Sequence, residues 1–156
     1  MNRAFTLIEI IVAIFVMTVG IVGVYALVPK IISITSANTN SFTASQLARE
    51  GIELIRNIRD TNWLEEDSFN DGLTTCSGGC EIDYDDSEFT AYDVGRYLRI
   101  NANGFYNYDP VSGTNSETKF KRKITITPDT DILNVKVEVS WAGDSFVVEE
   151  NLYNWQ

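Results

Sequence analysis

A single charged residue interrupts a long apolar run near the start of the chain. Between Phe5 and Val28 the only charged side chain is Glu9, and the run is 24 residues long. A helix needs roughly 20 predominantly apolar residues to cross a bilayer. A secretory signal peptide has a shorter apolar core followed by a small-residue cleavage site, which this run lacks. The run therefore predicts a membrane-spanning helix. Glu9 is the feature that a plain anchor does not explain, because a carboxylate inside a membrane usually has a functional partner.

The residues around Glu9 form a specific motif. Residues 4–9, Ala-Phe-Thr-Leu-Ile-Glu, resemble the processing motif of type IV pilins and type II secretion pseudopilins, with Ala4 where that family usually has Gly. The resemblance implies that a prepilin peptidase removes a short basic leader, cuts between Ala4 and Phe5, and that the new Phe5 amine is N-methylated. It also implies that Glu9 neutralises the N-terminal amine of a neighbouring subunit during assembly. This role agrees with the cost of leaving either charge unpaired in an apolar setting.

Helical periodicity continues beyond the apolar run. Pro29 predicts a kink or a local break, because proline removes a helical hydrogen bond. Apolar residues then recur at mostly three- to five-residue spacing up to about Asp60. The members of this stripe are Ile31, Ile34, Phe42, Leu47, Ile52, Ile55 and Ile58. We therefore expect one half of a long helix in the membrane or filament core, and the other half packed under a globular head.

The second half of the chain has strand patterns. Alternation is clearest in 132–141, and further strands are expected in 97–100, 104–108, 120–126 and 145–155. We predict three to five antiparallel strands laid against the second half of the helix. The fold class is thus α+β, a long N-terminal helix with a small antiparallel β-sheet head, as the pilin resemblance also implies.

The expected organisation has four parts. Residues 1–4 are the leader, 5–29 the transmembrane or filament-core helix, 30–62 the second half of the helix, and 63–156 the globular head with an acidic loop. The positive-inside rule places Arg3 on the cytoplasmic side and the head outside.

Two cysteines lie close together in the connection after the helix. Cys76 and Cys80 flank Ser-Gly-Gly, and glycines permit a tight turn. Outside the cytoplasm a disulfide is the favoured interpretation, with free thiols as the alternative. A metal site is disfavoured because two cysteines are too few ligands and the chain has no histidine.

The segment Glu81–Glu88 is rich in carboxylates. Calcium binds clustered oxygens in ordered loops, but the spacing is not that of an EF-hand, so a solvated acidic loop is the favoured interpretation and no metal is predicted.

The one basic cluster consists of Lys119, Lys121, Arg122 and Lys123. A DNA-binding pilin would need such a patch. The formal net charge of −10 opposes phosphate binding, so a solvated strand edge protected by lysines is favoured over nucleic acid binding.

Function is predicted from these features together. The absence of histidine removes the commonest general base and metal ligand, and no catalytic motif or cofactor site is evident, so an enzyme is not predicted. We expect a structural subunit of a type IV pilus or related pseudopilus filament. The looser resemblance of residues 120–141 to PilV-like minor pilins or I-type secretion pseudopilins indicates a minor one. A binding module at the filament tip, an adhesin or DNA-uptake receptor, is the alternative.

Partners and location follow from the resemblance. It implies other pilin or pseudopilin subunits, the prepilin peptidase, an inner-membrane assembly platform and membrane lipid as partners. The expected location is the inner membrane in a single pass, with the head outside the cytoplasm, and then an extracytoplasmic filament.

Overall fold

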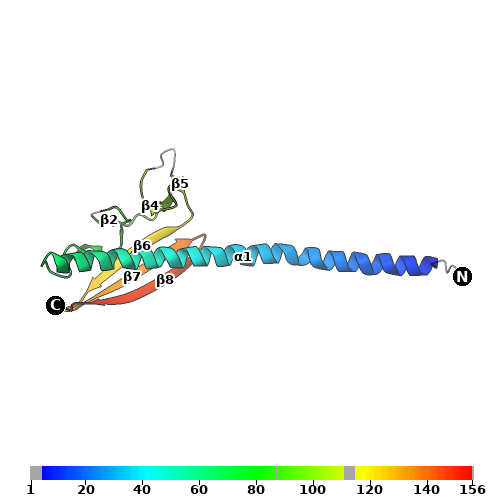
Figure 1. The fold of residues 1–156 in the computed structure, drawn as a ribbon, viewed down its shortest axis with the longest axis horizontal. Helices are drawn as coiled ribbons and strands as arrows, with labels where there is room; N and C mark the ends of the chain where they lie inside the picture. Colours follow the sequence, from blue (N-terminus) through cyan, green and yellow to red (C-terminus); the bar gives the residue numbers. More distant parts are fainter. Residues whose placement is uncertain (1–4, 87, 111–114, 156) are drawn as a thin grey trace. The chain divides into compact units, whose positions relative to one another are not determined.

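The computed structural model describes residues 5–86, 88–110 and 115–155 (Figure 1). They form one long helix, α1 (Leu7–Leu64), a short 3-10 helix, η1 (Leu73–Cys76), and strands that pair antiparallel. The α+β fold class, with a long N-terminal helix followed by antiparallel sheets, is confirmed. The strands are β1 (Cys80–Glu81), β2 (Thr90–Ala91), β3 (Arg99–Ile100), β4 (Tyr106–Asn107), β5 (Ser116–Glu117), β6 (Lys121–Pro128), β7 (Ile132–Trp141) and β8 (Asp144–Tyr153).

The chain divides into two compact units, Met1–Asn40 and Ser41–Gln156. The described part of the first unit is helical from Leu7 onward. Its large apolar side chains are all exposed, from 45% at Val28 to 79% at Phe5. This unit therefore buries no core of its own.

The helix α1 continues through Pro29 without interruption. The local break expected at this residue is therefore wrong. Proline removes one hydrogen bond, but the long run of helix-compatible residues on both sides keeps the backbone helical.

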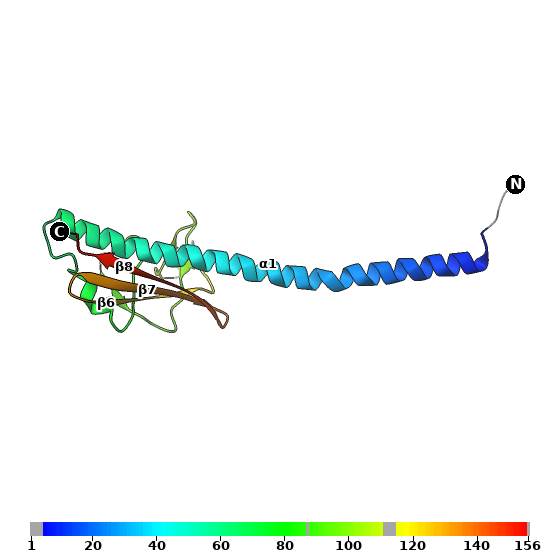
Figure 2. The ribbon, with the colours of Figure 1, turned by 90° about the horizontal axis from the view of Figure 1, so that it is seen from below.

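The second unit has a five-stranded sheet in the order β2-β1-β6-β7-β8. Figures 1 and 2 show α1 lying along one face of β6, β7 and β8. The core forms between them. Its α1 members are Ala44, Leu47, Ala48, Ile52 and Ile55, and its β7 members are Leu133, Val135, Val137, Val139 and Trp141. One stripe of the helix and one face of the sheet thus share a single core.

The strand β7 has the bounds predicted for it. Alternate residues from Leu133 to Trp141 are buried, while Asn134, Lys136 and Glu138 lie on the opposite face. Because a strand has a period of two, this alternation fixes which face meets the helix.

Gly51 lies where α1 comes close to the sheet. A Cβ atom at this position would lie 2.9 Å from Val137 Cγ1 and 3.3 Å from Arg122 Cδ. Glycine is costly inside a helix, and here the lack of a side chain lets β7 approach.

The strands β1 to β5 have two residues each, whereas β6 has 8 and β8 has 10. The expected strands 97–100 and 104–108 appear as β3 and β4, which pair from Arg99 to Asn107 and belong to a second sheet of order β4-β3-β5. The connection between Trp63 and Glu88 contains the end of α1, η1 and β1.

Candidate functional site

Phe5 is the first residue that the structure describes, and Ala4 lies outside the described residues. Phe5 precedes the helix by two residues, and its side chain is exposed. The residue that follows the bond predicted to be cut therefore lies close to the start of the helix.

Glu9 and Thr6 close the first turn of α1. The Glu9 amide donates to Thr6 Oγ1 at 3.4 Å, and the Thr6 amide donates to Glu9 Oε2 at 3.4 Å. The Thr6 hydroxyl also donates to Glu9 Oε2, at 3.5 Å. This reciprocal arrangement is a capping box, in which a threonine and a glutamate three residues apart satisfy orphan amides of the helix.

Among the described residues, no partner reaches the other oxygen of Glu9, Oε1. Within residues 5–86, 88–110 and 115–155, the carboxylate pairs with no lysine or arginine, and its hydrogen bonds end on Oε2. The neighbouring side chains of Ile8 and Ile10 are apolar and exposed. A lone carboxylate on an apolar surface can accept an ammonium group brought by another molecule.

The apolar part of α1 is long enough to cross a membrane. By length and composition it meets the requirement for a spanning helix, and none of its most apolar window is buried by the rest of the chain. The site around Glu9 thus lies at the start of a surface that the described protein leaves uncovered.

Cys76 and Cys80 are joined by a disulfide, with their Cα atoms 5.3 Å apart. Gly79 has a φ of 101°, a conformation that side chains rarely adopt. Cys80 pairs with Ile124 of β6. The bridge therefore fixes the end of η1 to β1, which lies between β2 and β6 in the main sheet.

The expectation of a solvated loop at Glu81–Glu88 is wrong for its first residues. Glu81 and Asp83 are 1% and 3% exposed. Asp83 Oδ2 accepts a hydrogen bond from the Tyr108 amide at 2.7 Å, and Oδ1 accepts one from the Asp85 amide at 3.3 Å. These carboxylates are buried because they serve as acceptors for backbone amides of neighbouring segments.

Glu81 holds a second loop in the same way. Its carboxylate accepts hydrogen bonds from the Asp93 amide at 3.2 Å and from Arg96 at 3.3 Å. Burial raises the pKa of the Glu81 carboxyl above its ordinary value, and the Asp93 amide and Arg96 oppose the shift. The buried acids are thus structural ties between loops.

The interpretation of the basic cluster as a strand edge is also wrong. The strand β6 lies between β1 and β7. Lys121 and Lys123 face away from α1, over the rings of Tyr97 at 4.3 Å and Tyr92 at 5.5 Å. The edge strands of this sheet are β2 and β8.

Arg122 is fully buried between α1 and the sheet. Its guanidinium donates to Glu50 at 3.0 Å, to the Leu47 carbonyl at 3.3 Å and to the Ile82 carbonyl at 2.7 Å. The Tyr108 hydroxyl donates to the Arg122 carbonyl at 3.1 Å, and burial raises the pKa of this hydroxyl. Arg122 thus joins the helix, β6 and the acidic segment.

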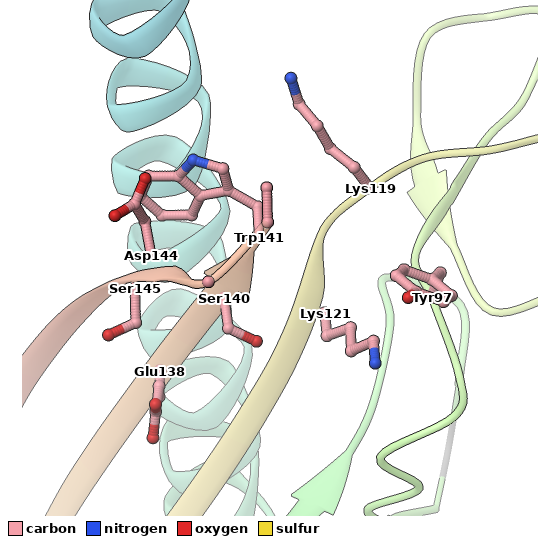
Figure 3. Close-up of a pocket in the computed structure, with 10 residues that line it drawn as sticks. Tyr97, Lys119, Lys121, Glu138, Ser140, Trp141, Asp144 and Ser145 are labelled. Atoms are coloured by element: carbon pink, nitrogen blue, oxygen red, sulfur yellow. The ribbon is translucent and has the colours of Figure 1, made fainter.

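A groove of about 480 Å³ opens at the end of the sheet where β6 begins and β7 turns into β8. Figure 3 shows Lys119 and Lys121 on its β6 side, and Glu138, Asp144 and the two serines on the β7–β8 side. We call it the lysine groove. In the described part of the chain, neither lysine pairs with a carboxylate.

Metal-binding groups are not evident in the described ranges. No cluster of three or more His, Cys, Asp or Glu side chains there has an arrangement that could hold an ion.

Comparison with known families gives one match. Residues 1–25 match the prokaryotic N-terminal methylation motif. No curated protein and no solved structure matches the chain. The motif covers the leader, the predicted cleavage bond, Glu9 and the start of the apolar helix.

Proposed function

We propose that the chain is a structural subunit of a type IV pilus or related pseudopilus filament. The N-terminal methylation motif, the long helix and the antiparallel head support this proposal, because together they are consistent with a type IV pilin-like protein. Its role is to be processed at Phe5 and to pack into the filament by α1. The looser likeness of residues 120–141 to minor pilins favours a minor subunit. The function is structural, not catalytic.

The geometry around Glu9 is the observation that carries the proposal. A plain membrane anchor gains nothing from a carboxylate within its apolar surface. Here Oε2 caps the helix that contains it, and no residue in the described ranges pairs with Oε1. Processing would create a suitable cation, the methylated amine of Phe5, on every subunit. We propose that Glu9 of one subunit accepts the Phe5 ammonium of a neighbour.

The exposed apolar surface supports the same conclusion. Large apolar side chains from Phe5 to Ile34 are at least 45% exposed, which is unfavourable in water. Lipid would cover them before assembly, and helices of other subunits afterwards. The proposed location is the inner membrane, with the head outside the cytoplasm, until the assembly platform moves the subunit into the filament.

The test is the N-terminus and mass of the membrane-extracted protein, co-expressed with a prepilin peptidase. We expect a chain that begins at N-methylated Phe5 and that enters sheared filaments. Two controls accompany this experiment. Phe5→Ala keeps Glu9 and changes only the residue that is predicted to be methylated. Expression without the peptidase shows the mass of the uncleaved chain. A chain that still begins at Met1 in the presence of an active peptidase would contradict the proposal.

A further inference from the structure

Lys30 is the one charged residue in a long uncharged stretch of α1. Residues 10–29 and 31–48 contain no lysine, arginine, aspartate or glutamate. The Lys30 side chain is exposed, and within the part of the chain that the structure describes it forms no ion pair. The residues three and four positions away on the helix are uncharged, so its own helix offers it no carboxylate.

Covering this lysine with other helices would be costly. In a membrane-inserted subunit, the flexible stem of Lys30 can carry the ammonium group to the water at the membrane surface. In a filament, side chains of other subunits would cover the same apolar surface, and a buried ammonium group needs a partner of opposite charge. A carboxylate supplied by another molecule would meet this need.

A groove of about 290 Å³ lies between α1 and the segment 82–86 in the second unit. Carboxylates and apolar side chains line it, and no lysine or arginine of the described residues does. We call it the acidic groove. Its lining residues are Glu50, Glu53, Leu54, Asn57 and Ile58 of α1, and Ile82, Asp83, Tyr84 and Asp86 of the segment.

Asp86 differs from the other carboxylates of the acidic groove. Glu50 and Glu53 each pair with an arginine already, and both oxygens of Asp83 accept backbone amides. Asp86 is exposed, and its Oδ2 accepts the Asp83 amide at 3.0 Å. Among the described residues, no cation pairs with Asp86. Four carboxylates and the two arginines paired with them thus leave an excess of negative charge in the groove.

The apolar lining of the acidic groove suits a lysine in particular. Leu54 and Ile58 are half-buried, and Tyr84 is 47% exposed. A lysine side chain buries its four-carbon stem along apolar surface while its ammonium group meets polar atoms. The groove therefore matches both parts of this side chain.

We propose that the Lys30 side chain of one copy enters the acidic groove of a second copy, where its ammonium group pairs with Asp86. The lone cation of residues 5–40 and the excess negative charge of the groove are complementary, which favours a second copy as the occupant. Because the two surfaces differ, the contact does not close on itself and can repeat along an open filament. The inference rests on the proposed function, and the contact is separate from the one that Glu9 makes.

The first experiment reverses the charges. Lys30→Asp or Asp86→Lys should lower the incorporated fraction of processed full-length subunit by roughly tenfold, since each places like charges in contact. The chain with both changes should recover to within about threefold of wild type, because the pair is restored with its charges exchanged. Lys119→Asp and Glu88→Lys make the same charge changes at exposed residues outside the contact and should incorporate normally.

The second experiment joins the two surfaces covalently. Both cysteines of the wild-type chain are already in the Cys76–Cys80 disulfide. Filaments assembled from a mixture of Lys30→Cys chains and Asp86→Cys chains should therefore give disulfide-linked dimers on oxidation. Filaments that contain either variant alone should not.

Two results would overturn the inference. One is a doubly reversed chain that incorporates no better than the single variants, and the other is mixed filaments that contain both cysteine variants without cross-links. The proposed function would survive either result, because the wild-type subunit would still enter filaments. It fails instead if the wild-type chain itself is not processed and incorporated.

Discussion

The two stretches of α1 differ in what covers them. Residues 7–40 are more apolar, yet none of them is buried. In residues 41–64 the helix is more polar, and Ala44, Leu47, Ala48, Gly51, Ile52, Ile55 and Arg59 are buried. Apolar content alone therefore does not produce a core. The second stretch meets the sheet of its own chain, whereas the first requires surfaces that other molecules supply.

Glu9→Ala should impair the packing of the first stretch against other subunits and leave the second stretch folded against its own sheet. In the proposed pairing, Glu9 is one partner of a charge pair in an apolar setting, and removing such a partner costs about 3–5 kcal/mol. The incorporated fraction of processed subunit should therefore fall by roughly 100-fold or more. The measurement is quantitative blotting of sheared filaments against the membrane pool.

The matched control for this prediction is Glu53→Ala. Glu53 lies on the same helix but in the head, where it pairs with Arg56 at the surface. Its loss should cost at most about 1 kcal/mol and leave incorporation unchanged. Equal incorporation of Glu9→Ala and wild type would remove Glu9 from assembly.

Arg122→Ala should have the converse effect, on the second unit. It removes one donor from the Leu47 carbonyl, which keeps its bond within the helix, takes the side-chain donor from the Ile82 carbonyl, and leaves Glu50 without its cation. We expect a loss of about 3–5 kcal/mol in the free energy of unfolding, measured by urea titration of the full chain in detergent with near-UV circular dichroism. Lys123→Ala, on the other face of β6, should cost no more than about 1 kcal/mol. Similar losses in both variants would show that burial of the guanidinium is not what stabilises the contact.

Gly51→Ala tests how closely the helix approaches the sheet. The new methyl group would meet Val137 Cγ1 at 2.9 Å, an overpacking cost of about 1–3 kcal/mol that a gain of about 1 kcal/mol in helix propensity partly offsets. The same unfolding measurement should show a net loss of stability. The loss caused by Gly51→Ala should be smaller when it is measured in a chain that already carries Val137→Ala. Gly20→Ala, where no atom lies within 4 Å, should leave the head unchanged. A stabilised Gly51→Ala head would contradict the close approach.

The smallest expected effect is a pH dependence from Glu81. Burial raises the pKa of this carboxyl in the folded state above its ordinary value of 4.5. Its contribution to stability is therefore fully present below about pH 4.5 and is lost as the pH rises through the folded-state pKa. Glu81→Gln cannot titrate, so its stability relative to wild type should be highest near neutral pH and should decline as the pH falls. A difference between the two proteins that does not change with pH would exclude this contribution.

The sequence predicts those features that depend on local pattern. The period-two alternation in 132–141 gives β7 because one face of that strand must be buried. The apolar run with Glu9 predicts the exposed start of α1. These features needed no knowledge of which segments meet in space.

The features that could not be predicted from the sequence depend on residues that are distant in the chain. Arg122 lies on the same face of β6 as the buried Phe120, Ile124 and Ile126. This alternation is the signal that could have predicted its burial. Its hydrogen-bond acceptors, however, lie 40 to 75 residues away in the sequence. In the sequence, Glu81 and Asp83 resemble exposed surface acids. In the structure, they accept hydrogen bonds from the amides of Asp93 and Tyr108. Polar residues inside a core are predictable only when their partners are known.

In a subunit inserted as proposed, the state of the Cys76–Cys80 disulfide would show whether the head has left the cytoplasm. Thiols stay reduced in the cytosol, and disulfides form outside it. In a subunit inserted as proposed, the turn that fixes η1 to β1 and β6 is therefore open on the cytoplasmic side and closes only after the head has crossed. Completion of the head would then be timed by translocation, and a closed bridge would distinguish exported subunits from those still awaiting insertion.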